Sequence, residues 1–157
     1  MSGKSTYREI ISKSAKETQK IAKILAEELL DPRVSNQNGA EVIALEGNLG
    51  SGKTTFIQGF ARALGIKEKV LSPTFVLIKI YKIRKSKKFR HLIHIDCYRL
   101  EKLKDLLHLG LKNFLKDRDA VILIEWADRV KKLLPKETFW IKFKHGKKFR
   151  ERILYRA

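Results

Sequence analysis

A glycine-rich octapeptide that directly follows a short apolar run is the strongest constraint on how this chain can fold. Residues 47–54, Gly-Asn-Leu-Gly-Ser-Gly-Lys-Thr, match the pattern G-x-x-x-x-G-K-[ST] at every defined position. The apolar run 42–45 before them predicts a strand, and residues 53–64 after them predict a helix that Gly65 ends. A strand, a tight loop and a helix in this order are typical of a phosphate-binding loop.

The defined positions of this loop have separate chemical roles. Glycines let the backbone turn tightly, so that successive N–H groups point at phosphate oxygens. The helix that follows adds the positive end of its dipole. We expect Lys53 to reach the β and γ phosphates of a nucleotide and the Thr54 hydroxyl to hold Mg²⁺.

Two further apolar runs end in an acidic residue. Residues 89–96 end in Asp96, and Glu125 closes the apolar part of residues 120–126. A phosphate-loop enzyme needs a second carboxylate near its metal, usually at the carboxyl end of a neighbouring strand. One of these acids could bind Mg²⁺ while the other positions or deprotonates an attacking water. Each acid alone could equally be an ordinary solvated residue at a strand end.

Three residues lie next to these acids in the sequence. His94 and Trp126 allow two interpretations each, and Cys97 allows one. His94 lies two residues before Asp96, so both side chains point to the same side of a strand. His94 is either a general base or a packing or hydrogen-bonding residue. Trp126 either belongs to the core or contacts a ligand or partner. Cys97 is most simply a buried apolar residue.

Strands and helices alternate along the whole chain, without a domain boundary. This pattern predicts one α/β domain, a sheet with helices on its faces. Residues 1–14 are polar and predict a loose segment, and Gly110 is unfavourable inside a helix. The other predicted helices span residues 15–30 and 103–115, the other predicted strands span residues 75–83, 138–144 and 152–155, and a hairpin tip falls at residues 84–88.

The composition restricts the cellular compartment and the chemical class of partner that we expect for this protein. The single cysteine excludes an internal disulfide, and no apolar run reaches the 18 or more residues of a membrane span. The start of the chain has no apolar segment, so we expect a cytoplasmic protein without a membrane anchor. The 35 Lys and Arg residues against 17 Asp and Glu give a net charge of +18, which favours anionic partners.

Much of this charge falls in two clusters. Residues 79–91 contain seven Lys or Arg and no acid, and residues 142–156 contain seven with a single acid. Aromatic residues interleave with the basic ones, which would suit contacts to RNA. A half-buried sheet produces the same alternation, so a solvated face remains the other interpretation. The interleaved aromatic residues are Phe89, Phe143, Phe149 and Tyr155.

Four ordered blocks give the chain a family resemblance. They are GNLGSGKTTF at residues 47–56, SPTF at 72–75, HIDCYRL at 94–100 and IEW at 124–126. With these blocks the chain resembles the TsaE (YjeE) family of P-loop ATPases, which support synthesis of threonylcarbamoyladenosine (t6A) beside the anticodon of tRNA. The resemblance covers most of residues 17–157. It implies a mainly parallel sheet with an antiparallel part, flanked by helices.

The resemblance also implies roles for individual residues. Thr74 lies in a switch-like segment that senses the γ-phosphate, and Asp96 lies in a second one and serves hydrolysis. Glu125 matches the family's acid that is associated with Mg²⁺, and Trp126 matches the aromatic residue next to that acid. Thr18 matches a threonine of the family that lies near the bound base. The implied nucleotide-binding loop consists of Gly47, Asn48, Leu49, Gly50, Ser51, Gly52, Lys53, Thr54 and Thr55.

The departures from the family pattern are small. Asn48 and Ser51 stand where members often carry Asp and Ala, and neither change removes a phosphate-binding N–H. A C-terminal arginine of the family corresponds to Arg150 or Arg152.

The function that the resemblance implies is a Mg-dependent ATPase of low intrinsic turnover. Its implied partner is the TsaD–TsaB heterodimer, which ATP binding or hydrolysis resets between rounds of tRNA modification. Direct contact with tRNA stays open. One alternative is a small-molecule P-loop kinase with residues 84–88 as a lid over the phosphates, and another is a basic RNA-binding module.

Overall fold

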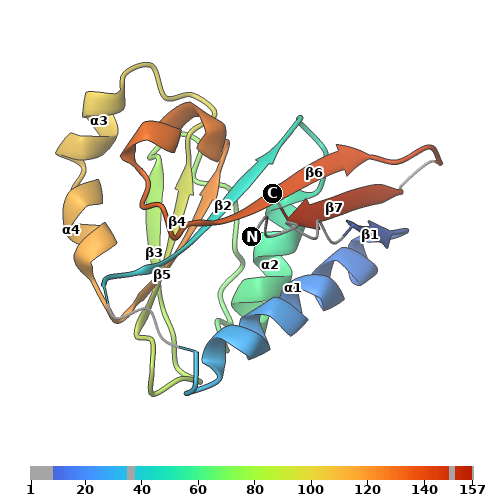
Figure 1. Cartoon of the computed structure of the whole chain (residues 1–157), viewed down its shortest axis with the longest axis horizontal. Coiled ribbons are helices and arrows are strands. Elements are labelled where there is room, and N and C mark those ends of the chain that lie inside the picture. Colours follow the sequence, from blue (N-terminus) through green and yellow to red (C-terminus); the bar gives the residue numbers. More distant parts are fainter. Residues whose placement is uncertain (1–8, 35–37, 149–150, 157) are drawn as a thin grey trace, which may run out of the picture.

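The described residues form one seven-stranded mixed sheet with helices on both faces (Figure 1). The computed structural model describes residues 9–34, 38–148 and 151–156. The strands lie in the order β1-β7-β6-β2-β5-β4-β3. They are β1 (Glu9–Ser12), β2 (Glu41–Gly47), β3 (Ile78–Lys82), β4 (His91–Asp96), β5 (Ala120–Glu125), β6 (Phe139–His145) and β7 (Arg152–Arg156). The helices are α1 (Ala15–Leu30), α2 (Lys53–Ala63), α3 (Leu103–His108), α4 (Leu111–Lys116) and the 3-10 helix η1 (Ala127–Leu133).

The central strands run parallel and the outer ones antiparallel. β2 pairs in parallel with both β5 and β6, and β5 pairs in parallel with β4. The pairs β3–β4, β6–β7 and β1–β7 are antiparallel. Because β2, β4 and β5 all run the same way, their carboxyl ends meet at one edge of the sheet. The predicted α/β class, mainly parallel with an antiparallel part, is confirmed.

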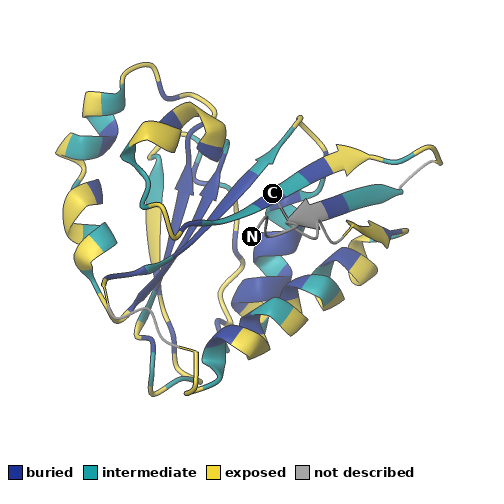
Figure 2. Cartoon of the chain, viewed as in Figure 1, coloured by how far each residue is buried: buried dark blue, intermediate teal, exposed yellow. Residues whose placement is uncertain are grey.

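Alternate residues of the central strands build two separate cores (Figure 2). On one face, Ile43 and Leu45 of β2 pack with Phe56 and Phe60 of α2, and α1 completes this layer. On the other face, residues such as Ala44 lie under α3, α4 and η1. All six residues of β5 are buried, as expected for a parallel strand covered on both faces.

Helices α1 and α2 pack closely against each other. A β-carbon on Gly59 would lie 2.6 Å from the Cα atom of Gln19, so only glycine permits this approach. α1 begins at Ser14, whose hydroxyl accepts the Glu17 N–H at 3.2 Å. At its other end, the Lys88 ammonium donates to the Leu29 carbonyl at 2.9 Å and thereby satisfies a terminal acceptor.

The structure confirms several predicted elements. The helix predicted at residues 15–30 has the same bounds, and the helix after the glycine loop ends at Ala63, with Gly65 at a φ of 79°. The hairpin predicted around residues 84–88 joins the antiparallel pair β3–β4. In the part of the chain that the structure describes, no helix is long and apolar enough to cross a membrane.

Three predicted elements were wrong in part. The strand predicted from residue 75 begins only at Ile78, because the Leu77 N–H bonds the Pro73 carbonyl at 2.8 Å and closes a turn. The helix predicted at residues 103–115 is interrupted at Gly110, which adopts a φ of 101° and starts a second helix. Residues 9–12 form β1 instead of a loose segment, and residues 1–8 lie outside the described part.

Candidate functional site

The glycine-rich loop joins the carboxyl end of β2 to the amino end of α2, as predicted. Gly50 and Gly52 have φ values of 74° and 104°, a left-handed backbone that side chains rarely adopt. The Ser51 N–H bonds the Asn48 carbonyl at 3.1 Å and tightens the turn. No side chain caps α2, so the N–H groups of its first turn stay available for an anion.

Lys53, the lysine of the motif, lies inside this loop. Its ammonium donates to the Gly47 carbonyl at 2.5 Å and to the Asn48 carbonyl at 3.0 Å. It also lies 4.4 Å from the centre of the Trp126 ring. Burial lowers the pKa of Lys53, and the nearby carboxylates of Glu125 and Asp96 counteract part of that effect. The cation is therefore held at the place where the motif predicts phosphate.

Glu125 ends β5 and accepts three hydrogen bonds while almost fully buried. Thr54 Oγ1 donates to its Oε1 at 2.6 Å, and Ser72 Oγ donates to its Oε2 at 3.2 Å. His94 Nε2 lies 2.7 Å from the same Oε2. Burial raises the pKa of Glu125, but the hydrogen bonds from His94, Thr54 and Ser72 outweigh it and hold the pKa below its ordinary value. The carboxylate is therefore ionised at neutral pH.

Asp96 ends β4 directly opposite Glu125 in the sheet register. The Ser72 hydroxyl hydrogen-bonds the Oδ2 atom of Asp96, and the Tyr98 N–H donates to its Oδ1 at 2.9 Å. Ser72 therefore bridges the two strand-end carboxylates. The hypothesis that both acids serve one site agrees with this geometry.

A pocket of about 380 Å³ collects most of the predicted residues. Predicted residues that line it are Leu49, Gly50, Gly52, Lys53, Thr54, Thr55, Thr74, Asp96, Glu125 and Trp126. Ser72, Tyr98 and Arg99 line it as well, although no role was assigned to any of them from the sequence. The available signal was their position in the family blocks, because Ser72 lies in SPTF and Tyr98 and Arg99 lie in HIDCYRL.

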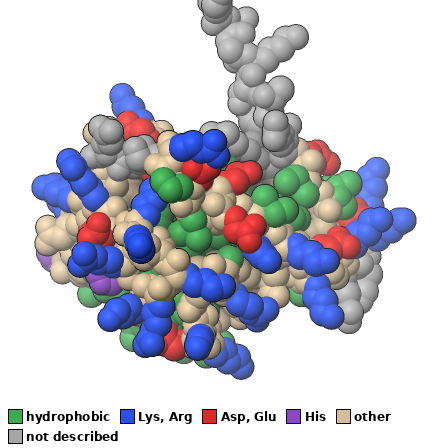
Figure 3. Space-filling model, turned by 90° about the horizontal axis from the view of Figure 1, so that it is seen from below, with side chains coloured by type: hydrophobic (Ala, Val, Ile, Leu, Met, Phe, Trp, Pro, Cys, Tyr) green, Lys and Arg blue, Asp and Glu red, His purple; other side chains and the backbone are tan. Residues whose placement is uncertain are grey.

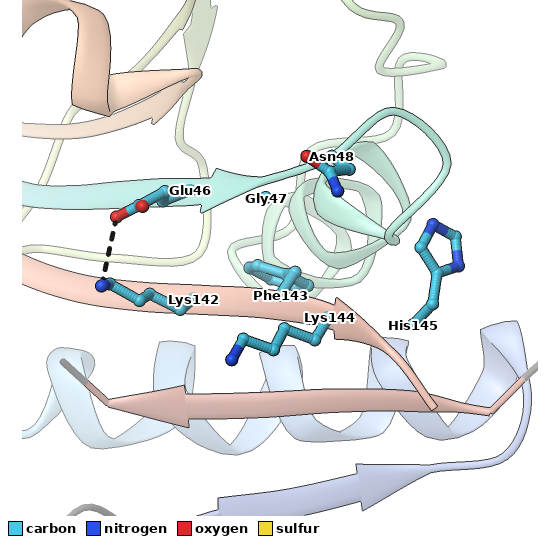
Figure 4. A pocket seen from close by; sticks show the side chains of 7 residues that line it. All are labelled: Glu46, Gly47, Asn48, Lys142, Phe143, Lys144 and His145. Carbon is cyan, nitrogen blue, oxygen red and sulfur yellow. Dashed lines mark ion pairs between the residues drawn. The ribbon is translucent and has the colours of Figure 1, made fainter. Parts of the chain in front are cut away.

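The remaining predicted residues lie beside this pocket. Gly47 and Asn48 line a second hollow of about 530 Å³ between β2 and β6, where Glu46 pairs with Lys142 at 3.8 Å (Figure 4). Ser51 is buried under the loop. Thr18 is also buried, and its hydroxyl lies 2.7 Å from that of Ser12.

The C-terminal strands also reach the glycine-rich loop. Arg152 Nε donates to the Gly50 carbonyl at 3.2 Å, so Arg152 is the described candidate for the C-terminal arginine, while Arg150 lies outside the described residues. His145 stands at the end of β6, facing the loop, with its Nε2 atom 3.4 Å from the Leu49 carbonyl (Figure 4).

The structure distinguishes between the two interpretations of His94, whereas Trp126 combines features of both of its interpretations. His94 is fully buried and acts through its hydrogen bond to Glu125, which favours the packing and hydrogen-bonding interpretation. Its Nδ1 atom has no partner among the described residues. Trp126 has a left-handed backbone with a φ of 56°, packs partly on the core and also lines the pocket. Cys97 is buried, as expected.

The donor set suits a magnesium ion held together with phosphates. Thr54 and Glu125 supply a hydroxyl and a carboxylate oxygen, which are hard ligands of the kind Mg²⁺ prefers. Among the described residues no group of three or more His, Cys, Asp or Glu could hold a metal alone. Because Mg²⁺ usually keeps waters and substrate oxygens beside one or two protein ligands, this sparse set fits it.

A sequence model of the family described as "Threonylcarbamoyl adenosine biosynthesis protein TsaE" matches residues 12–153. The chain belongs to the TsaE family. Among the TsaE relatives, the protein named tRNA threonylcarbamoyladenosine biosynthesis protein TsaE of Bacillus subtilis is 38% identical over 130 residues, which cover 83% of this chain and 73% of that one. The protein of the same name from Aquifex aeolicus is 36% identical over 126 residues, or 79% and 80% of the two chains.

A solved structure resembles the TsaE fold of this chain over nearly its whole length. The crystal structure of Bacillus subtilis YdiB superposes with a TM-score of 0.72 and 31% sequence identity, covering 96% of this chain and 84% of that one. The family resemblance drawn from four sequence blocks is therefore confirmed.

Proposed function

We propose that this chain is a cytoplasmic Mg-dependent ATPase of t6A synthesis that acts on the TsaD–TsaB heterodimer. Two kinds of support meet in this proposal. The relatives bear the name of tRNA threonylcarbamoyladenosine biosynthesis proteins. The site combines a phosphate-binding loop with two acids at the ends of neighbouring strands.

One observation carries most of the argument. The Ser72 hydroxyl bonds both Asp96 and Glu125, and Glu125 in turn accepts the Thr54 hydroxyl of the loop. These contacts support the proposal that Asp96, as the general base, and Glu125, as the metal-associated acid, serve one site. A bland strand-end acid would face solvent, whereas both of these carboxylates are buried.

In the proposed mechanism the loop residues 47–55 bind ATP, and Lys53 transfers its hydrogen bonds from loop carbonyls to the β and γ phosphates. Thr54 and Glu125 would hold Mg²⁺, which when bound would offset the negative charge of the phosphates. Asp96 orients the attacking water and accepts its proton. Thr18 and Trp126 flank the loop, Thr18 next to the bound base.

The pocket rim offers a route from nucleotide to partner. Phe75 and Val76 follow Thr74 in the turn before β3, and both are largely exposed, as is Leu49 of the loop. Arg99 lies 4.5 Å from the Phe75 ring. If Thr74 contacts the γ-phosphate, its turn and these apolar side chains move together, which changes the surface offered to TsaD–TsaB.

The test is ATP hydrolysis by the purified protein, alone and with TsaD–TsaB, with Asp96→Ala as the matched variant. We expect slow turnover alone, stimulation by the heterodimer, and a loss of about 10²–10⁴-fold in the variant. Full activity of Asp96→Ala would remove its assigned role. Absence of both stimulation and complex formation would contradict the assigned partner.

No feature of the described residues favours the kinase alternative. The hairpin at residues 84–88 precedes the first residue of β4, while Asp96 ends that strand, so the hairpin lies at the far end of the sheet from the loop. It does not cover the phosphates, and the proposed lid was wrong. Phosphate transfer from ATP to a panel of nucleosides, measured against transfer to water, would test this conclusion.

A further inference from the structure

One edge of the sheet carries a concentration of positive charge that the ATPase site does not use. Residues 47–95 contain eleven Lys or Arg and a single acid, Glu68. Nine of these basic side chains are exposed. Arg90 pairs with Asp119 and Lys79 lies over the Tyr81 ring, and the other seven lie on α2, on the segment after it, and on β3 and its hairpin. We call them the basic edge: Arg62, Lys67, Lys69, Lys82, Arg84, Lys85 and Lys87.

The basic edge is hollowed rather than flat. Arg62, Lys67 and Lys69 line, together with the one acid Glu68, a hollow of about 340 Å³ beside α2. Lys85 and Lys87 line another of about 520 Å³ beside the end of α1. The segment after α2 lies against the hairpin, because a β-carbon on Gly65 would lie 2.7 Å from Lys85 Cγ. Seen from below, Lys and Arg side chains cover much of the molecule and acidic ones are fewer (Figure 3).

The charges of the basic edge are not used in ion pairs within the described part of the fold. Nearby, Lys88 bonds the carbonyls at the end of α1, and Arg90 pairs with Asp119 at 3.6 Å, so both have structural partners. No acidic side chain in the described part of the chain forms an ion pair with a residue of the basic edge. Like charges gathered in this way repel one another in the folded protein, and a bound anion would offset that repulsion.

The aromatic residues of this region are turned inward. Tyr81 and Phe89 are 1% and 2% exposed and belong to the core under α2. Phe143 of the second basic cluster is 2% exposed, while the side chains of Phe149 and Tyr155 lie outside the described part. Stacking of bases on Phe89 or Phe143 was therefore a wrong interpretation. What remains is charge, which suits a phosphate backbone and not unstacked bases.

The basic edge is also separate from the nucleotide pocket. β4 runs from His91, next to the hairpin, to Asp96 in the pocket. At about 3.3 Å per residue, that strand puts roughly 17 Å between the two regions. An anion at the basic edge therefore does not compete with a nucleotide at the loop.

We propose that the basic edge binds the phosphate backbone of folded RNA. The choice of tRNA as that RNA rests on the proposed function, because t6A is made on tRNA. The hollows seat phosphates of neighbouring nucleotides, and the exposed lysines and arginines around them neutralise charge without reading sequence. tRNA bound in this way would contact the end of the protein that lies away from the nucleotide pocket.

The experiment titrates labelled tRNA with the full chain and follows fluorescence anisotropy from 50 to 300 mM KCl. The test variant is Lys67→Glu/Arg84→Glu/Lys87→Glu. The control is Lys104→Glu/Lys112→Glu/Lys132→Glu, which has the same net charge but changes exposed residues on the opposite sheet face. We expect the test variant alone to lose at least about tenfold in affinity and to flatten the log Kd against log salt slope by about three.

The outcomes separate the possibilities. Equal losses in both variants would show that net charge alone matters, and an unchanged test variant would place the RNA elsewhere; either result overturns the proposal. Competition by polyglutamate as effective as that by tRNA would overturn the assignment to RNA. Thermal unfolding and ATP hydrolysis of the test variant control for its fold. Lys53→Ala should keep tRNA affinity, so a failure of the ATPase proposal is distinguishable from a failure of this one.

Discussion

Ser72 shows how a single hydroxyl can organise two charged groups. Its single hydroxyl proton lies within reach of both Asp96, the shorter contact, and Glu125, two carboxylates that would otherwise repel each other across adjacent strands. Hydrogen bonds to charged groups contribute about 1.5–3 kcal/mol. The residue is therefore a positioning group for the proposed chemistry.

We expect Ser72→Ala to lower ATP turnover by roughly 10–100-fold, because the two carboxylates lose their shared donor. Ser72→Thr keeps a hydroxyl and should recover part of that loss. Steady-state hydrolysis over a Mg²⁺ titration measures both variants. Wild-type turnover and Mg²⁺ dependence in Ser72→Ala would show that the bridge has no role.

Cys97 gives a second prediction at the residue scale. The thiol is 1% exposed, and burial, aided by Asp96, raises its pKa to about 12. A raised thiol pKa disfavours the thiolate, so its reactive form is scarce at pH 8. We expect no reaction with Ellman's reagent in the native protein and one equivalent in denaturant. Rapid labelling of the native protein would contradict this packing.

Two helices depend on a glycine for their contact. A β-carbon on Gly59 would meet Gln19 backbone and side-chain atoms at 2.6–2.7 Å, and backbone cannot move aside as a flexible side chain can. In α2 alone, alanine would be favourable by about 1 kcal/mol. The packing of α1 on α2 therefore requires glycine at position 59, although α2 alone would favour alanine there.

We expect Gly59→Ala to lower the free energy of unfolding by about 1–3 kcal/mol, because overpacking outweighs the gain in helix propensity. Urea denaturation followed by circular dichroism measures the change. Arg62→Ala, on the exposed side of the same helix, should be nearly neutral. A stabilised Gly59→Ala would mean that α1 and α2 do not approach as closely as described.

Element bounds were predictable where the pattern was local. The residues 15–30 have helical spacing and a proline that ends them, and the structure keeps those bounds. Residues 75–77 are apolar and look like strand, yet a turn closed by the Pro73 carbonyl places them at the pocket rim. Gly110 divides its helix because it adopts a φ of 101°, a backbone conformation that the periodicity of the sequence does not reveal.

At the scale of the whole molecule, the net charge of +18 opposes folding through self-repulsion. Salt screens this repulsion, with a Debye length near 10 Å at 0.1 M. We expect the Tm to rise by a few degrees between 20 and 300 mM NaCl, as measured by differential scanning fluorimetry. The control variant Lys104→Glu/Lys112→Glu/Lys132→Glu should show a smaller rise. A Tm that falls with salt would show that attractive charge pairs dominate.

The sequence by itself determined the glycine-rich loop, because the motif places its glycines, lysine and hydroxyl at fixed local spacing between a strand and a helix. It also identified Asp96 and Glu125, since each closes an apolar strand. Only the tertiary structure decided that Ser72 joins these acids, that Arg152 reaches the loop, and that Phe89 faces the core. These facts depend on register and packing between segments distant in the chain. Local pattern carries no information about which side chains such segments bring together.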